Sequence, residues 1–187
     1  AAKAAFPGWS ETPVQKRVQV LFRFKALLDE HIDELATILA TENGKTHAEA
    51  VGDVQRGAEI VEFACGAPTL MMGESLENVS KGLDVVTWRQ PLGVCVGIVP
   101  FNFPAMIPMW MFPIAIACGN TFVLKAASMV PNTGARLMEL LVEAGLVSPS
   151  KAVVMHVISS LRWAGAKGKR FGYSYATLGK GYGLNRE

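Results

Sequence analysis

The sequence predicts an α/β fold, in which helices precede a partial and mostly parallel sheet. Residues 12–41 repeat apolar side chains at steps of three and four, which is the pattern of amphipathic helices. From residue 83 onward, short β-branched and apolar runs alternate with helix-like segments. Strands that alternate with helices are typical of a parallel sheet. Half of the 187 residues are hydrophobic, so the chain can bury a core of its own.

The first half of the chain is predicted to be helical. The pattern over 12–41 is interrupted near 29–33, where we expect a break between two helices. Gly44 follows the last apolar position and is expected at the left-handed position that ends a helix. A further helix is predicted from about residue 46 to residue 65, and Gly66 and Pro68 favour its end there.

The next segment is predicted to contain a loop and two strands. Residues 70–82 show no periodicity and are expected to form a loop. Residues 83–90 are rich in β-branched and aromatic side chains, which favour a strand. Residues 93–99 are predicted to form a second strand, and its apolar run from Val94 to Val99 indicates that it is buried.

The remaining elements complete the alternation. A helix is predicted over 104–117, a turn at 119–120 and a strand over 121–124. A helix over 132–144 should begin after Pro131 and end at Gly145. Residues 152–158 are apolar and β-branched, and are expected to add another strand.

Composition limits the classes of function. A net charge of +2 gives no sign of nucleic-acid binding. The apolar stretch 103–117 is interrupted by prolines and is shorter than the roughly 20 residues of a membrane span, so no membrane association is expected. No signal peptide is visible, and a first residue other than Met indicates an incomplete or processed start. Three cysteines without ligand spacing, Cys65, Cys95 and Cys118, favour a reduced, cytoplasmic protein without a metal site.

Asn102 is the first candidate for chemistry. It follows the predicted strand 93–99 and lies between Pro100 and Pro104. Ligands of α/β proteins bind at the carboxyl ends of strands, and a neutral amide there can donate to an oxyanion that develops during a reaction. The alternative, which spacing alone favours, is a proline-rich turn whose Asn binds its own backbone.

Four separated motifs carry a resemblance to a known family. They comprise residues 63–73, 88–93, 100–113 and 117–125. Together they resemble the aldehyde dehydrogenase superfamily, and are most similar to the CoA-acylating methylmalonate-semialdehyde dehydrogenases. The resemblance extends over about residues 1–147. It implies an incomplete aldehyde dehydrogenase fold with a partial Rossmann-like sheet, in which residues 1–158 form part of an NAD-binding domain.

The resemblance also implies a cofactor site for NAD. Val99, through its backbone, and Phe101, through its ring, should flank the cofactor, although ordinary core packing is the alternative for both. Lys125 should donate to the adenosine ribose. The family continues with Lys-Pro-Ser-Glu, whereas this chain has Ser128 in place of the carboxylate and Met129 where relatives often carry a cation. Weak NAD binding with poor discrimination against NADP is therefore expected.

Arg56 is the candidate for substrate binding. The substrate implied by the resemblance, a small semialdehyde with a carboxylate, would need a cation, and Arg binds carboxylates bidentately. The alternative is a surface Arg that pairs with Asp53 or Glu59 at helical spacing.

The family's chemistry implies roles that this chain would fill only in part. A Cys thiolate attacks the aldehyde, Asn102 and a backbone N–H hold the oxyanion, NAD accepts hydride, and CoA takes the acyl group. The nucleophilic Cys and the general-base Glu belong to downstream motifs that are absent here. Cys118 has no neighbouring His or cation in the sequence and is not expected to replace the nucleophile. The chain alone should therefore be inactive.

Two hypotheses remain open at this stage. In the first, the chain is part of an enzyme from a family of homo-oligomers, located in the cytoplasm or, in a eukaryote, the mitochondrial matrix. In the second, it is a non-catalytic module that binds a nucleotide or a subunit. Residues 159–187 form a basic, glycine-rich tail, for which polyanion binding, disorder and a frameshift are the interpretations.

Overall fold

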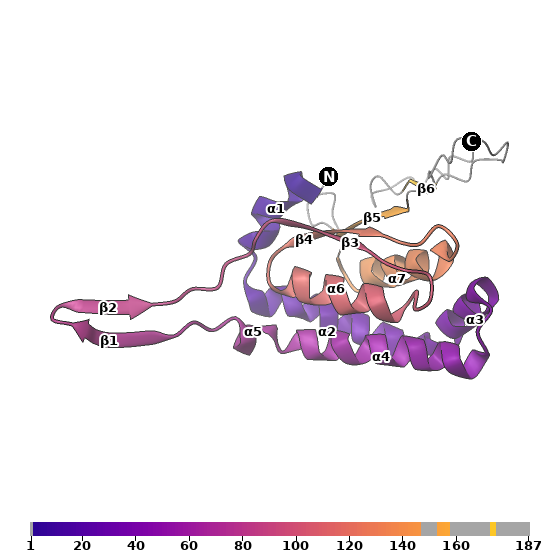
Figure 1. The fold of residues 1–187 in the computed structure, drawn as a ribbon, viewed down its shortest axis with the longest axis horizontal. Helices are drawn as coiled ribbons and strands as arrows, with labels where there is room; N and C mark the ends of the chain where they lie inside the picture. The colour runs from indigo at the N-terminus through magenta and orange to yellow at the C-terminus, as the bar shows by residue number, and fades with distance from the viewer. Residues whose placement is uncertain (1, 147–152, 158–172, 175–187) are drawn as a thin grey trace.

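The predicted α/β class is confirmed by a computed structural model, which describes residues 2–146, 153–157 and 173–174. Figure 1 shows a sheet on one side of the body, α6 and α7 beneath it, and α2 and α4 beneath those helices. A long hairpin, β1–β2, projects away from this body. None of the helices in the described ranges is long and apolar enough to cross a membrane.

Five helices form the first part of the chain: α1 Ala2–Ser10, α2 Val14–Glu30, α3 Ile32–Asn43, α4 His47–Cys65 and α5 Ala67–Leu70. The predicted break falls at His31, and Gly44 ends α3 with φ at 82°, as predicted. Thr46 begins α4 with a capping box, because its hydroxyl accepts from the Glu49 backbone and the Glu49 carboxylate accepts from the Thr46 backbone. The helices α1 and α5 were not predicted.

Residues 70–82 are not simply a loop, and this prediction was wrong. They contain β1 Ser75–Ser80, which pairs antiparallel with β2 Leu83–Val86. The strand predicted over 83–90 is also shorter than expected and belongs to this separate hairpin. Every residue of both strands is exposed, so neither strand has a face that packs on a core. The sequence of β1, Ser-Leu-Glu-Asn-Val-Ser, accordingly lacks the apolar–polar alternation that signals a strand.

The main sheet contains β3 Val94–Ile98, β4 Thr121–Lys125, β5 Val153–Val157 and β6 Tyr173–Ser174, in that order. The pairs β3–β4 and β4–β5 are parallel, as predicted, whereas β5–β6 is antiparallel. In the first pair, Ile98 lies opposite Lys125. The last residues of these two neighbouring strands therefore meet at one edge of the sheet.

The prediction that β3 is a buried strand was wrong. Val94, Val96 and Ile98 are 43%, 63% and 72% exposed. Within the described residues β3 has one strand neighbour, β4, and one of its faces stays uncovered. An apolar run cannot distinguish a covered strand from an edge strand, because the cover comes from elements distant in the sequence.

Two helices connect the strands of the main sheet. The helix α6 Met106–Ala117 begins two residues later than predicted, and α7 Pro131–Glu143 begins at Pro131 itself. Proline suits a first helical position because the N–H that it lacks would have no partner there. The Glu42 carboxylate accepts from the backbone N–H groups of Asn132 and Thr133, both at 2.8 Å, and so caps α7.

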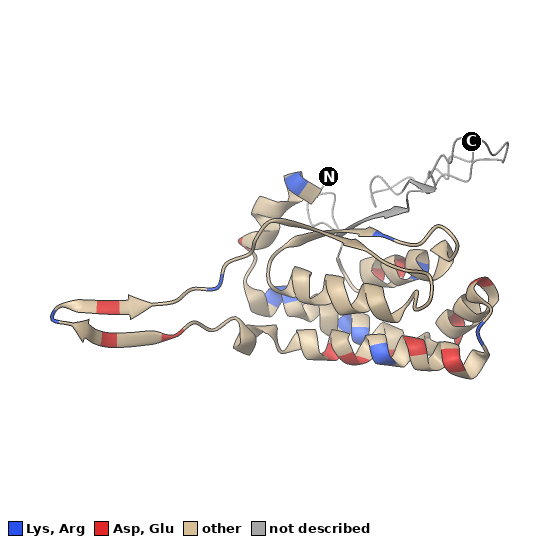
Figure 2. Ribbon diagram, in the orientation of Figure 1, with Lys and Arg blue, Asp and Glu red and all other residues tan. Residues whose placement is uncertain are grey.

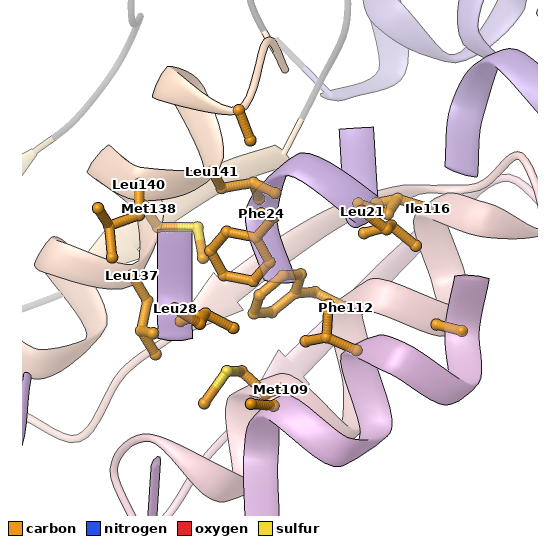
Figure 3. Packing of buried hydrophobic residues seen from close by; sticks show 14 of the residues in the cluster. Leu21, Phe24, Leu28, Met109, Phe112, Ile116, Leu137, Met138, Leu140 and Leu141 are labelled. Atoms are coloured by element: carbon orange, nitrogen blue, oxygen red, sulfur yellow. The ribbon is translucent and has the colours of Figure 1, made fainter. Parts of the chain in front are cut away.

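The core lies mainly among the helices, with Phe122 and Leu124 of β4 joining it, and Figure 3 labels members from α2, α6 and α7. Phe24 of α2 and Phe112 of α6 pack with ring centroids 5.8 Å apart. Around them lie fully buried side chains from α2, α6 and α7: Leu21, Leu28, Met109, Ile116, Leu137, Leu140 and Leu141. Figure 2 shows that charged residues gather on α3 and α4, away from the tan surface of α6.

Candidate functional site

The carboxyl ends of β3 and β4 bring together two of the predicted groups of residues. Val99, Phe101 and Asn102 follow β3, whereas Lys125 ends β4 and the turn with Ser128 and Met129 comes after it. The two strand ends are joined directly, because the Val99 N–H donates to the Lys125 carbonyl oxygen at 3.1 Å. This is the edge at which parallel α/β sheets bind ligands.

The residues after β3 differ in exposure. Val99 is buried, which also fits the core-packing alternative for its side chain. Phe101 is 53% exposed, so core packing does not describe its ring. Asn102 is exposed, and its side-chain amide forms no hydrogen bond with the described part of the chain. The Asn102 side-chain amide is thus available to a ligand.

The residues at the end of β4 offer one cation. Lys125 is partly buried and is the last residue of β4. Ser128 and Met129 are exposed in the turn before α7, and Met129 is 73% exposed. The predicted site therefore has a donor for ribose hydroxyls on β4, and neither of these two turn residues supplies a carboxylate acceptor.

Arg56 lies on the exposed side of α4. The alternative that it pairs with Asp53 was wrong, because Asp53 is buried and binds the Lys45 ammonium group, with Nζ and Oδ2 2.8 Å apart. Nor does Arg56 form an ion pair with Glu59 or with any other residue that the structure describes. The guanidinium of Arg56 is unpaired within this part of the chain.

Sequence reasoning missed three residues beside the loop between β3 and α6: Asn43, Lys45 and Asp53. Asn43 at the end of α3, Lys45 in the turn after it and Asp53 on α4 all contact this loop or the start of α6. One signal was present in the sequence, since Asp53 shares the apolar stripe of its helix with Ala50 and Val54. A carboxylate on such a stripe becomes buried and needs partners.

Cys118 caps α6 and has a local environment that the sequence did not reveal. Burial raises the pKa of its thiol, and the nearby Arg17 guanidinium opposes that shift only partly. The sequence around Cys118 contains no cation, whereas the fold brings Arg17 close to it. The raised pKa still supports the expectation that Cys118 does not replace the nucleophile, because little thiolate forms at neutral pH. Among the described residues no group of three His, Cys, Asp or Glu side chains gathers to hold a metal ion.

Comparison with known proteins decides the family. The family model described as "Aldehyde dehydrogenase family" matches residues 1–163. The chain belongs to the aldehyde dehydrogenase family. Among its relatives, malonate-semialdehyde dehydrogenase 1 of Geobacillus thermodenitrificans is 56% identical over 146 residues, which is 78% of this chain and 30% of the relative. Malonate-semialdehyde dehydrogenase of Bacillus cereus is 53% identical over 167 residues, 86% of this chain and 34% of the relative.

Solved structures of aldehyde dehydrogenases agree with this assignment. Methylmalonate-semialdehyde dehydrogenase from Oceanimonas doudoroffii matches with a TM-score of 0.76 and 52% identity, over 78% of this chain and 30% of that one. A protein described as a methylmalonate-semialdehyde dehydrogenase of Sinorhizobium meliloti, complexed with NAD, matches with a TM-score of 0.76 and 49% identity, over 79% and 30%. The predicted resemblance is thus confirmed, and the chain spans about a third of the length of these relatives.

Proposed function

We propose that this chain is the cofactor-binding part, with one oxyanion donor, of an NAD-dependent, CoA-acylating dehydrogenase of malonate or methylmalonate semialdehyde. The observation that carries the proposal is that Asn102 follows β3 and Lys125 ends β4, two neighbouring parallel strands whose carboxyl ends are joined by the hydrogen bond from the Val99 N–H to the Lys125 carbonyl oxygen. The names of the relatives, and the NAD in one of the similar structures, support the choice of substrate class and cofactor.

The residues at the sheet edge fit a dinucleotide in part. Lys125 would donate to the ribose hydroxyls, Val99 would offer its backbone, and the exposed ring of Phe101 would cover an apolar part of the cofactor. When bound, the nicotinamide supplies a hydride acceptor. A carboxylate at position 128 would repel a 2′-phosphate, and the chain has Ser128 there instead, which predicts poor discrimination between NAD and NADP.

Asn102 would act on the aldehyde. A thiolate from the downstream part of such an enzyme adds to the carbonyl carbon, and the carbonyl oxygen becomes negatively charged. The exposed Asn102 side-chain amide would donate a hydrogen bond to that oxygen. This hydrogen bond becomes stronger as negative charge develops on the oxygen, so it would stabilise the transition state more than the substrate and lower the barrier. Arg56 would bind the substrate's own carboxylate through its unpaired guanidinium.

The experiment that tests this role is a chimaera. In it the chain replaces the 146 matching residues of the Geobacillus relative, and NADH production is followed with malonate semialdehyde, NAD and CoA. We expect activity, and we expect Asn102→Ala to lower kcat by about 10²- to 10³-fold. Gln15→Ala, at an exposed position of α2, is the control and should leave kcat unchanged. A chimaera in which Asn102→Ala keeps full activity contradicts the proposal.

Calorimetry on the 187-residue chain tests the cofactor site separately. We expect weak binding of NAD and NADP with similar affinities, and a further loss of both with Lys125→Met but not with Lys81→Met at the hairpin tip. Sub-micromolar NAD binding with strong rejection of NADP would contradict the role given to Ser128. An inactive chimaera together with nucleotide binding favours the second hypothesis, a non-catalytic nucleotide-binding module.

A further inference from the structure

The loop that carries Asn102 is held on both sides of this residue by the end of α3 and the turn after it. On one side, the side-chain amide of Asn43 donates to the Phe101 carbonyl oxygen at 2.7 Å. On the other side, the ammonium group of Lys45 lies over the ring of Phe103, 4.0 Å from its centroid. An ammonium group at this distance is attracted by the negative face of the ring.

A third contact fixes the point at which the loop enters α6. The Asp53 carboxylate accepts from the Met106 backbone N–H at 2.7 Å, and its other oxygen binds Lys45 Nζ at 2.8 Å. The Asp53 side chain is 1% exposed and the Lys45 side chain 19%, so the bond to the Met106 N–H is buried and the bond to Lys45 is partly buried. A buried carboxylate with two partners strongly resists displacement, because breaking either bond leaves charge unpaired.

Lys45 connects two of these contacts, since it binds Asp53 and covers Phe103 at the same time. Its own position is set by its neighbours in the chain. Gly44 takes the left-handed conformation that ends α3, and the Thr46 capping box begins α4 at once. Lys45 is therefore the middle residue of a turn that is fixed at both ends.

These contacts bear on catalysis because an oxyanion donor works best when it is already in place. A donor that must reorganise during the reaction loses part of its effect. We propose that Asn43, Lys45 and Asp53 are positioning residues that fix the backbone on both sides of Asn102 and so aim its amide. The proposal rests on the proposed oxyanion role of Asn102, but the rigidity of the loop can be measured without catalysis.

The first test is hydrogen exchange by NMR at the Met106 amide of the 187-residue chain. In a Lys45→Met/Asp53→Asn double variant, which leaves no buried charge unpaired, we expect this amide to exchange about tenfold faster. The Ile107 amide, which donates to the Phe103 carbonyl oxygen at 3.3 Å, should also exchange faster. The single variant Lys45→Arg keeps a cation beside Asp53, so the Met106 amide should exchange as slowly in it as in the unchanged chain. Lys16→Met, at an exposed position of α2, is the matched control.

Two outcomes of this test would overturn the proposal. One is unchanged exchange at Met106 in the double variant. The other is an acceleration that extends equally to the amides of α7, because that would reflect a general loss of stability and not release of the loop.

The second test uses the peptide group between Phe101 and Asn102. Asn43 binds its oxygen, so Asn43→Ala should shift the ¹⁵N and ¹H resonances of the Asn102 backbone amide, whereas Gln15→Ala should not. In the active chimaera, Asn43→Ala should then lower kcat with little change in KM. If Asn43→Ala shifts these resonances but leaves kcat unchanged, the positioning proposal is contradicted and the oxyanion role of Asn102 is not. The oxyanion role is contradicted only if Asn102→Ala keeps full activity.

Discussion

Gly57 of α4 lies directly against Met109 of α6. A Cβ atom added at position 57 would collide with the Met109 methyl group and would lie 3.2 Å from both its Cβ and its Sδ. Met109 is fully buried, so its side chain has little room to withdraw. The two helices approach closely at this point because one of them has no side chain there.

Gly57→Ala should therefore lower the free energy of unfolding by about 1–2 kcal/mol, since overpacking outweighs the gain in helix propensity. Gly52 lies on the same helix with nothing within 4 Å of an added Cβ, and Gly52→Ala should instead raise the free energy of unfolding by about 0.5–1 kcal/mol. Urea unfolding of the two variants measures the difference. Equal effects of both substitutions would contradict this packing.

Glu34 should make the stability of the chain depend on pH. Its hydrogen bond from Arg136, and a weaker one with His31, hold the pKa of the Glu34 carboxyl below its ordinary value. A lowered pKa in the folded state stabilises the fold above the ordinary pKa of Glu, about 4.3, and this contribution is lost as the pH falls through the lowered value.

Glu34→Gln should accordingly destabilise the chain at pH 7 but not at a pH below the lowered pKa of Glu34, where the carboxyl is protonated in both the folded and the unfolded chain. The side chain is 42% exposed, so solvent screening limits the effect to about 1 kcal/mol or less. Thermal melts at a series of pH values, with Glu30→Gln as the control, measure it. A destabilisation that persists unchanged in acid would show that the charge is not responsible.

Cys118 should react slowly with iodoacetamide at neutral pH. Burial raises the pKa of its thiol, so the thiolate fraction at pH 7 is smaller than that of a free Cys, and the rate should still rise above pH 9. Mass spectrometry of labelled peptides gives the rate at this residue, with a synthetic peptide of residues 114–120 as the reference. Equal rates for the chain and the peptide at pH 7 would disprove the shift.

The uncovered face of β3 should make the chain associate. Val96 and Ile98 are exposed beside one another on alternate positions of the strand, and contiguous exposed apolar surface favours self-association. Val96→Thr/Ile98→Thr should lower the mass measured by light scattering at high concentration. Leu76→Thr, which changes an equally exposed residue of the hairpin, shows whether the hairpin is responsible instead.

The 187-residue chain alone should give no aldehyde-dependent NADH production. None of its three cysteines occurs in the sequence context of the family's nucleophile, and covalent capture of the aldehyde requires one. The absorbance of NADH with methylmalonate semialdehyde, NAD and CoA measures this. Turnover that disappears with Cys118→Ala would contradict the prediction.

The sequence predicted those elements whose signal is local. The helices α2, α3 and α4 follow from apolar periodicity, and Gly44 and Thr46 mark their ends by their own chemistry. The helix α1 was missed because its position depends on remote partners. Trp9 donates to the Ile116 carbonyl oxygen at 2.9 Å, more than a hundred residues along the chain. No local pattern encodes such a contact.

The candidate site shows the same division. Asn102 and Lys125 could be found from strand ends and family motifs, because strand ends are visible in the sequence. The residues that hold the Asn102 loop were missed, since Asn43 of α3 and Asp53 of α4 act across more than fifty residues. The apolar stripe of α4 signals that Asp53 is buried but does not show which loop it binds. The exposure of β3 likewise depends on which other elements cover the sheet, and the residues of β3 do not reveal this.

The β1–β2 hairpin separates two halves of the chain that are interleaved in space. The helices α1–α5 precede it, and the main sheet with α6 and α7 follows it, yet α4 packs on α6 and Arg17 donates to the Ala117 carbonyl oxygen at 2.8 Å. Cleavage of the backbone at the exposed Lys81 would break none of these contacts. Two polypeptides made separately, one for each side of the hairpin, should therefore recognise each other and reassemble, which makes this chain a natural candidate for split-protein complementation.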